Sequence, residues 1–272
     1  ENVTGNIYVA DTQNNRVQVF TPAGGFIRAF AGSGDFLMNK PQGVAADFSL
    51  GVVVADTGNN RILRFTQGGV AVVKFGAYGT GPGRFWEPVD VRVWTHAGSG
   101  GAAVRRLAVS DCQNNRVQIF RPDGTYLVTV GTAGTFNGGL HLPCGSFPVA
   151  DSSLIYVADT GNLNDDGDAR IQWFNVVIDG DGDGMNDFWE DANGLDSSRN
   201  DALEDPDGDG LLNIGEFRAG TDPHDGDSNG NGVGDLGEIY NGHDPADPDS
   251  AVGPGDVPAY VALTATPVAV TT

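Results

Sequence analysis

Between residues 179 and 238 the chain repeats one twelve-residue pattern of oxygen-bearing side chains three times. In each copy Asp or Asn stands at positions 1, 3, 5 and 9, Gly at position 6 and Glu at position 12. The glycine belongs where the chain turns sharply, because a residue without Cβ adopts such a conformation at the least cost. The copies span 179–190, 205–216 and 227–238 and are called the first, second and third loops. Nearly all of the repeated positions are polar, so the fold of this region depends on what the oxygens bind.

The spacing of the oxygens is that of a calcium-binding loop. A calcium ion takes about six to eight oxygen ligands, with a backbone carbonyl from position 7 and both oxygens of the glutamate. We therefore predict calcium as the cofactor, with three ions or more. Apolar residues recur at position 10, which predicts a short helical turn and a small core after each loop. The predicted ligands are Asp179, Asp181, Asp183, Met185, Asp187 and Glu190 in the first loop; Asp205, Asp207, Asp209, Leu211, Asn213 and Glu216 in the second; and Asp227, Asn229, Asn231, Val233, Asp235 and Glu238 in the third.

A disordered acidic linker is the simpler alternative, since runs of Asp and Gly are usually unstructured. Disordered segments do not keep ligand register, which favours the calcium loops. Residues 176–250 hold 21 acidic residues against 2 arginines, whereas residues 1–175 hold 14 acidic and 13 basic residues. Two like charges repel by about 4 kcal/mol at close range near a protein surface. We therefore expect the acidic segment to be loose without calcium and ordered with it.

Three stretches of this region resemble the thrombospondin type 3-like calcium-binding repeats of bacterial secreted proteins. They read GDGDGMNDFWEDANGLD, DPDGDGLLNIGEFRAGTDP and DSNGNGVGDLGEIYNGHDP. The resemblance implies that residues 179–249 form a stiff stalk around their ions rather than a switch. Asp222 and Asp225 occupy the places of linking aspartates in such arrays, which makes them further candidate ligands.

The first 175 residues contain a different repeat, a strand–turn–strand unit marked by an aspartate. The aspartates at 11, 56, 111 and 159 are 45, 55 and 48 residues apart, a period typical of propeller blades or other arrays. Segments 52–55 and 155–158 are apolar without alternation, as expected where both sheet faces are covered. The copies are IYVADTQNNRVQVF (7–20), VVVADTGNNRILRF (52–65), LAVSDCQNNRVQIF (107–120) and IYVADTGN with RIQWF (155–162, 170–174). Further strands are predicted at 26–30, 70–75 and 126–130, and at 43–46, 89–93 and 147–150.

The motif DTGNNR between two strands, with the loop FGAYGTGPGRFWEP (75–88), resembles the NHL-repeat β-propellers over nearly all of residues 5–175. The Asp and the following Arg of each unit are interpreted as turn-forming and ion-paired residues rather than catalytic ones. The fourth copy departs from the pattern through the insertion LNDDGDA (163–169). Asn164, Asp166 and Asp168 in that insertion are candidate ion ligands, and a solvated turn is the alternative.

The strand count gives only about three and a half blades, fewer than the roughly four to eight of closed propellers. Either further blades precede Glu1 in the native product or another copy of the chain supplies them, because an open sheet edge is normally covered. The predicted fold class is mainly β: a partial NHL-type β-propeller (1–175), a calcium-stabilised, loop-rich stalk with short helical turns (176–250), and a linker with a C-terminal β-strand (251–272). The strand, AYVALTATPVAV (259–270), either begins another domain or adds to the sheet edge of a neighbour.

The compartment is inferred from calcium and from cysteine. Calcium modules of this kind bind in about the 10⁻⁴ to 10⁻³ M range met outside cells, and no run of residues is long and apolar enough to span a membrane. We therefore expect an extracellular or cell-surface protein. Cys112 and Cys144 should lie on one propeller face, where a disulfide and two buried thiols remain alternatives. Asn2 begins a glycosylation sequon.

No catalytic residue is predicted. Some related propellers are lyases or lactonases with a metal at the channel mouth, but of the four histidines only His141 lies near that predicted mouth. His96 is placed in a Gly-rich loop on the opposite face, and His224 and His243 in the acidic stalk. Nucleic-acid binding is not expected, because the acidic segment repels phosphates. The expected function is a secreted calcium-binding structural or interaction protein, the subunit of an extracellular fibre or surface array that binds itself, other extracellular proteins or glycans. The alternative is a fragment of a larger cell-surface adhesin or propeller enzyme.

Overall fold

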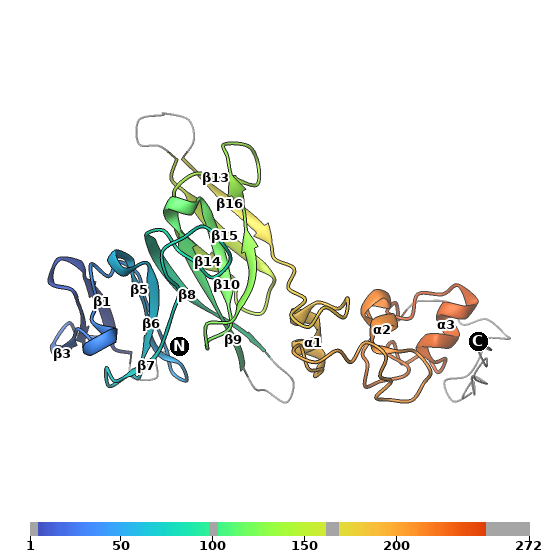
Figure 1. Cartoon of the computed structure of the whole chain (residues 1–272). Coiled ribbons are helices and arrows are strands. Elements are labelled where there is room, and N and C mark those ends of the chain that lie inside the picture. Colours follow the sequence, from blue (N-terminus) through green and yellow to red (C-terminus); the bar gives the residue numbers. More distant parts are fainter. Residues whose placement is uncertain (1–4, 98–102, 162–168, 249–272) are drawn as a thin grey trace, which may run out of the picture. The chain divides into compact units, whose positions relative to one another are not determined.

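The structure is a computed structural model that describes residues 5–97, 103–161 and 169–248. The described residues form two compact units, one of residues 5–97, 103–161 and 169–178 and one of residues 179–248 (Figure 1). Three predicted features lie outside the described residues. They are the terminal strand at 259–270, the sequon at Asn2, and the insertion with Asn164, Asp166 and Asp168.

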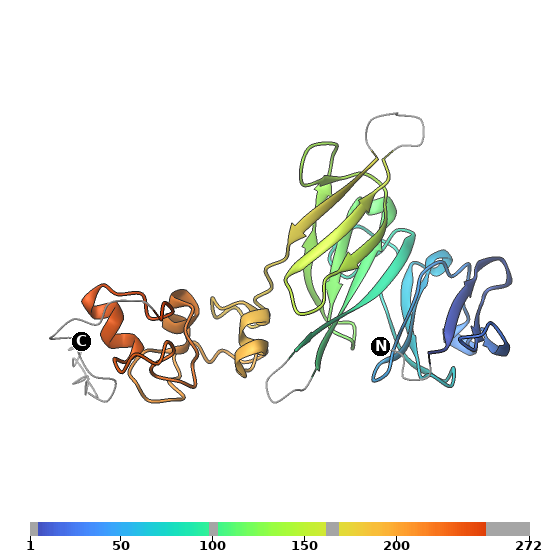
Figure 2. The same ribbon diagram turned by 180° about the vertical axis from the view of Figure 1, so that it is seen from behind.

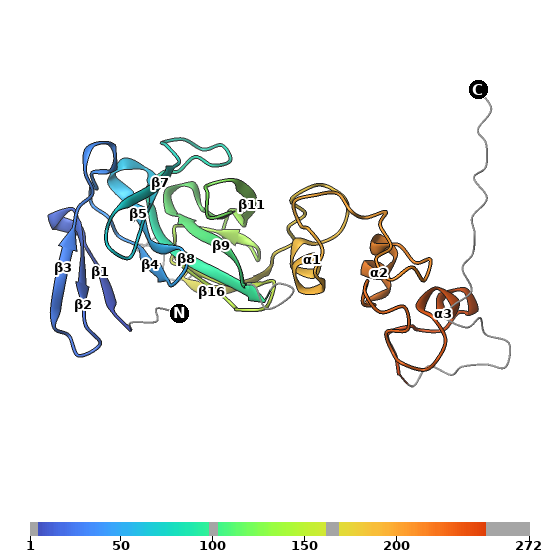
Figure 3. The same ribbon diagram turned by 90° about the horizontal axis from the view of Figure 1, so that it is seen from below.

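The first unit is built from four antiparallel sheets that follow one another along the chain (Figures 1 and 3). In the described residues these sheets have three, four, four and three strands, in the orders β1-β2-β3, β4-β5-β6-β7, β8-β9-β10-β11 and β14-β15-β16. Each sheet therefore resembles a full or partial propeller blade, as predicted. The strands are β1 (Ile7–Asp11), β2 (Arg16–Phe20), β3 (Phe26–Phe30), β4 (Val44–Asp47), β5 (Gly51–Asp56), β6 (Arg61–Phe65), β7 (Ala71–Phe75), β8 (Pro88–Ala97), β9 (Ala103–Asp111), β10 (Arg116–Phe120), β11 (Tyr126–Val130), a short parallel pair β12 (Thr132–Ala133) and β13 (Gly139–Leu140), β14 (Pro143–Pro148), β15 (Leu154–Asp159) and β16 (Arg170–Asn175).

The aspartate of each unit ends one strand and faces the arginine that begins the next. Arg61 Nε donates to Asp56 Oδ2 at 2.7 Å, and the backbone N–H of Asn39 donates to Asp56 Oδ1 at 2.6 Å. A 3₁₀ turn (Thr57–Asn59) connects Asp56 to Arg61 and ends at Asn60. The φ of Asn60 is 53°, a left-handed value that Asn tolerates better than most residues. Asn60 Oδ1 then accepts the backbone N–H of Glu87 at 2.8 Å, on the segment that leads into the next sheet. The interpretation of this motif as turn-forming and ion-paired is confirmed.

Apolar side chains fill the space between neighbouring sheets. Val52 and Val54 of β5 pack into a cluster shared with the first sheet, while Val53 and Ala55 pack into a cluster shared with the third. The prediction that this strand is covered on both faces is confirmed. In the last sheet β15 differs, because Ile155 and Val157 are buried but Tyr156 between them is 43% exposed. There the same prediction is wrong for the described residues, since only one face of the strand is covered.

Two local predictions in the first unit are also wrong. The strand expected at 147–150 is β14, which begins at Pro143 because its pairing with β15 runs from Pro143 opposite Asp159 to Pro148 opposite Ile155. His96 does not lie in a loop: the hairpin of β8 and β9 continues to Ala97 opposite Ala103, so His96 is a strand residue. Its side chain is 4% exposed and its ring centroid lies 5.1 Å from that of Trp94.

Among its described residues the second unit contains three short helices, each of which begins at position 9 of an acidic loop (Figures 1 and 2). They are α1 (Asp187–Asn193), α2 (Asn213–Ala219) and α3 (Asp235–Asn241), and each ends at a glycine in the left-handed conformation. The predicted helical turns are thus present. The predicted core differs in part: the apolar side chains at position 10 are half-buried, whereas those at loop position 7, Met185, Leu211 and Val233, are buried. Trp189 of α1 and Phe217 of α2 do pack edge to face, 5.2 Å apart.

Candidate metal centres

The aspartates of each loop hold the loop curled through hydrogen bonds from its own backbone. In the first loop Asp179 accepts the N–H groups of Gly182 at 2.8 Å and of Gly184 at 3.1 Å, and Asp183 accepts that of Met185 at 2.9 Å. The second and third loops repeat this network from Asp205 and Asp227. Glycine 6 has φ between 92° and 97° in the three loops, which explains why the position needs glycine.

This curling brings carboxylate oxygens together at two loops. Within each of three groups, one candidate ligand oxygen from every member lies within 4.8 Å of the others. The groups are Asp179 with Asp181 and Asp183, Asp183 with Glu190 and Asp201, and Asp205 with Asp207 and Asp209. Most of the aspartates predicted as ligands in the first two loops are therefore neighbours in space.

The glutamates at position 12 supply the test of whether a cation fits. Glu190 and Glu216 are 0% exposed, and neither oxygen of Glu190 nor Oε2 of Glu216 has a hydrogen-bond partner. Burial, followed by the nearby aspartates, raises the pKa of each glutamate to about 8. An uncompensated buried charge costs several kcal/mol. A cation at these oxygens removes that cost, so the residues present fit a metal ion.

The aspartates at position 3 carry the same signature. Asp181 Oδ2 and Asp207 Oδ2 are buried without a partner, while the other oxygen of each accepts a backbone N–H of its own loop, at 3.2 and 3.1 Å. Burial is the main cause that raises the pKa of Asp207 to about 6. One oxygen of each side chain thus fixes the loop and the other is left for a ligand, which is what an ion site requires.

The third loop satisfies its glutamate from within. Asn229 Nδ2 donates to Glu238 Oε2 at 2.9 Å and Asn231 Nδ2 donates to Glu238 Oε1 at 2.7 Å. The amides that replace two aspartates therefore compensate the buried carboxylate, which is 1% exposed. The third loop keeps the predicted ligand pattern but differs from the first two in what its glutamate contacts.

The residues at positions 7 and 9 are not part of the carboxylate groups. Asp187, Asn213 and Asp235 each begin a helix and tie it to the chain around them; Asp235, for example, accepts Ser228 N at 3.0 Å and Ser228 Oγ at 2.7 Å. Their role as ligands, and that of the carbonyls of Met185, Leu211 and Val233, stays a prediction. Asp222 and Asp225, the predicted linking ligands, are exposed.

Sequence reasoning missed Asp201. This residue lies outside the twelve-residue register of any loop, four positions before Asp205, and it joins the group of Asp183 and Glu190. No spacing rule for a single loop includes such a position. The only signal in the sequence is an acidic residue in a short segment between two loops, which is too common to single it out.

A family comparison covers part of the first unit. Residues 2–20 and 38–65 match the NHL repeat. The first unit is an NHL-repeat, β-propeller-like domain. We refer to it as the NHL unit. No curated protein matches the chain.

Several solved structures are similar to the chain at low sequence identity. A streptogramin B lyase matches 64% of this chain and 52% of its own at 14% identity, with a TM-score of 0.42. A catalytically inactive variant of virginiamycin B lyase from Staphylococcus aureus matches 64% of this chain and 53% of its own at 14% identity, with a TM-score of 0.40. An auxiliary nutrient binding protein from Bacteroides thetaiotaomicron matches 58% of this chain and 43% of its own at 13% identity, with a TM-score of 0.43. The chain spans about half the length of these proteins.

The NHL unit contains a cavity of about 480 Å³ lined by Asp47, Val93, Thr95, Arg105, Pro148 and Ala150. Its acid and base are paired, with Arg105 Nε 2.7 Å from Asp47 Oδ1. His141, the histidine predicted near the channel mouth, is half-buried, and its backbone N–H donates to Asp159 Oδ1 at 2.6 Å. Cys112 is half-buried and Cys144 exposed, and both are free thiols.

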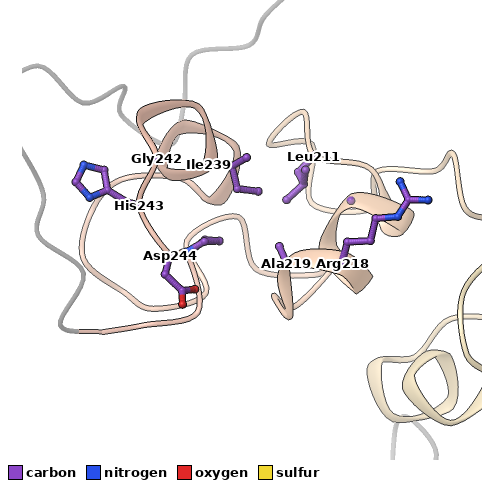
Figure 4. Close-up of a pocket in the computed structure, with 9 residues that line it drawn as sticks. Leu211, Arg218, Ala219, Ile239, Gly242, His243 and Asp244 are labelled. Atoms are coloured by element: carbon purple, nitrogen blue, oxygen red, sulfur yellow. The ribbon is translucent and has the colours of Figure 1, made fainter.

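A second cavity, of about 560 Å³, lies beside α2 and α3 of the acidic unit (Figure 4). Its lining includes Leu211, Arg218, Ile239 and His243. None of the loop carboxylates lines it, although Leu211 belongs to the second loop. In the part of the chain that the structure describes, no helix is long and apolar enough to cross a membrane.

Proposed function

We propose that the acidic unit binds calcium through its loops and that the protein is a secreted or cell-surface structural or interaction protein. The observation that carries the proposal is the repeated burial of carboxylate oxygens without partners, at positions 3 and 12 of both the first and the second loop. Because both loops leave oxygens at the same two positions without hydrogen-bond partners, we infer that each loop binds the same kind of ligand. The resemblance to thrombospondin type 3-like repeats supports the same proposal.

Calcium suits these centres better than magnesium. The candidate donors are all oxygens, several come from flexible carboxylates, and the loops supply more of them than the few that magnesium usually takes from protein. Magnesium also keeps much of its water, whereas the glutamates at position 12 are fully buried. A dehydrated ion with a large coordination number is the species that this arrangement favours.

Packing between repeats supports a continuous stalk rather than three calcium-binding loops that are independent of one another. A side chain at glycine 184 would lie 3.6 Å from Ile214 Cδ1, and one at glycine 210 would lie 3.1 Å from Leu236 Cδ2. The residue at position 10 of one repeat therefore packs over the turn of the repeat before it. Occupied loops would stiffen this stack because each turn is also a packing surface.

Calorimetric titration of the metal-free full chain with calcium tests the proposal. Glu190→Gln and Glu216→Gln should each abolish one of the tighter binding events. Glu204→Gln is the matched control, because Glu204 is half-exposed and paired with Arg199 rather than buried in a loop. Absence of calcium binding by the wild type, or equal effects of all three variants, would contradict the proposal.

A separate observation supports self-association through the NHL unit. On the last sheet Phe147, Tyr156 and Trp173 stand opposite one another across three strands, and they are 66%, 43% and 67% exposed. On the first sheet Ile7 and Phe26 flank Phe20 in the same way, 45% and 61% exposed. We propose that these two outer faces associate between copies of the chain, since inner sheets of the unit bury the equivalent surfaces against one another.

Sedimentation velocity over a range of concentrations, with calcium present, tests this association. Trp173→Glu should shift the chain toward the monomer, because it places a charge in the apolar row. Tyr240→Glu is the control, an exposed aromatic on the acidic unit (82% exposed). A wild-type chain that stays monomeric at the highest concentration, or a Trp173→Glu chain that associates as well as the wild type, would rule the proposal out.

A further inference from the structure

One acidic side chain joins the first metal centre from outside its loop. Asp201 follows α1 and precedes the second loop, and it is 3% exposed. One of its oxygens lies within 4.8 Å of candidate ligand oxygens of Asp183 and Glu190. Its Oδ1 is buried and has no hydrogen-bond partner.

The rest of Asp201 is held in place by the protein. Its Oδ2 accepts the backbone N–H of Asp196 at 3.2 Å and lies 3.4 Å from Arg199 Nη2. Its backbone N–H donates to Asp183 Oδ2 at 3.3 Å. The side chain is therefore fixed through one oxygen, and the other oxygen is unsatisfied in a buried position beside two predicted calcium ligands.

We propose that Asp201 is a carboxylate ligand of the ion in the first loop, in addition to those of the loop itself, and that it is supplied by the segment that leads into the second repeat. The proposal rests on calcium binding by the loops, as proposed above. About six to eight oxygens surround a calcium ion, so the first loop has room for a ligand beyond its own. Ligation gives the Oδ1 atom the partner that it lacks.

The second loop has no equivalent of Asp201 among the described residues. The oxygen of Asp209 that corresponds to Asp183 Oδ2 accepts the backbone N–H of Leu236 at 3.5 Å. The neighbouring acid, Asp235, has both oxygens engaged by Ser228. Counting positions 1, 3, 5 and 12 together with Asp201, the first loop thus has five acidic side chains, the second loop four, and the third loop two with two amides. Because ligand charge tunes affinity, the first loop should bind calcium most tightly and the third least.

Asp201 also connects the first centre to the second repeat. Its backbone carbonyl accepts Asn213 Nδ2 at 2.9 Å, and the carbonyl of the next residue, Ala202, accepts the N–H of Ile214 at 3.1 Å. Both donors belong to the start of α2. An ion that fixes Asp201 therefore also fixes the segment on which α2 is placed, and filling the first loop should favour closure of the second.

The test measures calcium affinity and the hydration of a bound lanthanide on the full chain. Asp201→Ala is compared with Glu204→Gln, which changes an exposed acidic residue of the same segment that is paired with Arg199. Both are made in a Glu216→Gln background, which weakens the second loop so that the first equivalent of metal reports on the first. Calorimetry gives the calcium affinity, and terbium luminescence lifetimes in H₂O and D₂O give the number of water molecules on the ion.

Asp201→Ala should weaken calcium binding by about a hundredfold, since even groups that only orient a ligand are worth about 10- to 100-fold in metal affinity. It should also add about one water molecule to bound terbium, because water takes the vacated position. Glu204→Gln should change neither quantity. If Asp201→Ala does not fold, as judged by circular dichroism with saturating calcium, Asp201→Asn replaces it, with an expected loss of about tenfold from the missing charge.

The outcomes separate the two proposals. A wild-type chain that binds no calcium overturns both of them. Wild-type calcium binding that is equally strong in Asp201→Ala overturns only the role of Asp201. Weaker calcium binding without an added water molecule also overturns it, because Asp201 would then position other ligands and not contact the ion.

Discussion

The two units bury carboxylates in opposite ways. In the NHL unit Asp56 and Asp111 are 0% exposed, and each is surrounded by an arginine, an asparagine amide and a backbone N–H of the chain. In the acidic unit Glu190 is equally buried, yet both of its oxygens lack a partner. The comparison shows that burial of an acid is not itself a sign of a ligand. What distinguishes the acidic unit is that the protein leaves its buried oxygens unsatisfied.

The largest expected difference follows from removing calcium. A chelator should loosen residues 179–248 and leave the NHL unit intact, because only the former depends on a bound ion. At a free calcium concentration about 100 times Kd, binding stabilises a site by about 2.7 kcal/mol, so its removal should speed cleavage of this region by about 100-fold. Limited proteolysis with mass spectrometry locates the cuts. Equal protection of the acidic unit with and without chelator would contradict the claim that this unit depends on a bound ion.

Among single substitutions, the largest effect is expected from Asp56→Ala in the NHL unit. The change leaves Arg61 and the Asn39 N–H without their buried partner, which should cost about 3–5 kcal/mol of unfolding free energy. Urea denaturation measures this cost, and the loss should be the same with and without calcium. Asp35→Ala is the control, because the Asp35 side chain is 85% exposed and its surface pairing with Lys74 should add little to stability. A calcium-dependent loss in Asp56→Ala would contradict the distinction between the units.

Acid should weaken the NHL unit through His96. Burial, with a further contribution from Arg106, lowers the pKa of His96 to about 4, while Asp151 opposes the shift. The folded state then disfavours the charged imidazole, so the stabilisation is complete above the unfolded pKa of about 6.5 and is lost as pH falls toward 4. Between pH 7 and pH 5 the loss should be about 2 kcal/mol.

Hydrogen exchange of β8 and β9, with saturating calcium, measures that loss. His96→Phe should flatten the pH dependence by removing the titrating group while keeping an aromatic ring beside Trp94. An unchanged pH dependence in this variant would show that other groups are responsible.

The smallest effect is expected in the third loop. Asn231→Asp removes the amide that donates to Glu238 Oε1 and makes the loop more like the first two. Without calcium the variant should lose about 1–3 kcal/mol of local stability, since a buried carboxylate loses its donor. With calcium it should bind more tightly. Local stability from hydrogen exchange and affinity from calorimetry check both signs, and an increase in metal-free stability would show that the amide is not what satisfies Glu238.

Much of this contrast was predictable from the sequence. The repeated Asp and Arg of the NHL unit are local partners five residues apart, so pattern and turn chemistry sufficed to interpret them. The loop register likewise predicted which aspartates gather in the acidic unit. The exposure of Tyr156 depends on whether a further sheet covers β15, and the strand position of His96 depends on how far β8 and β9 extend. No local pattern encodes either. Asp201 escaped prediction for the same reason, because its contact with Asp183 and Glu190 arises from the path of the chain between two repeats.

The most direct test is a crystal structure of the calcium-bound chain with anomalous diffraction to locate the ions. We predict peaks at the first and second loops, with oxygens of Glu190, Asp201 and Glu216 at about 2.3–2.6 Å from an ion, and none at the Asp–Arg pairs of the NHL unit. Loops without a peak, or peaks whose ligands exclude the buried glutamates, would contradict the claim that these oxygens are placed for a cation.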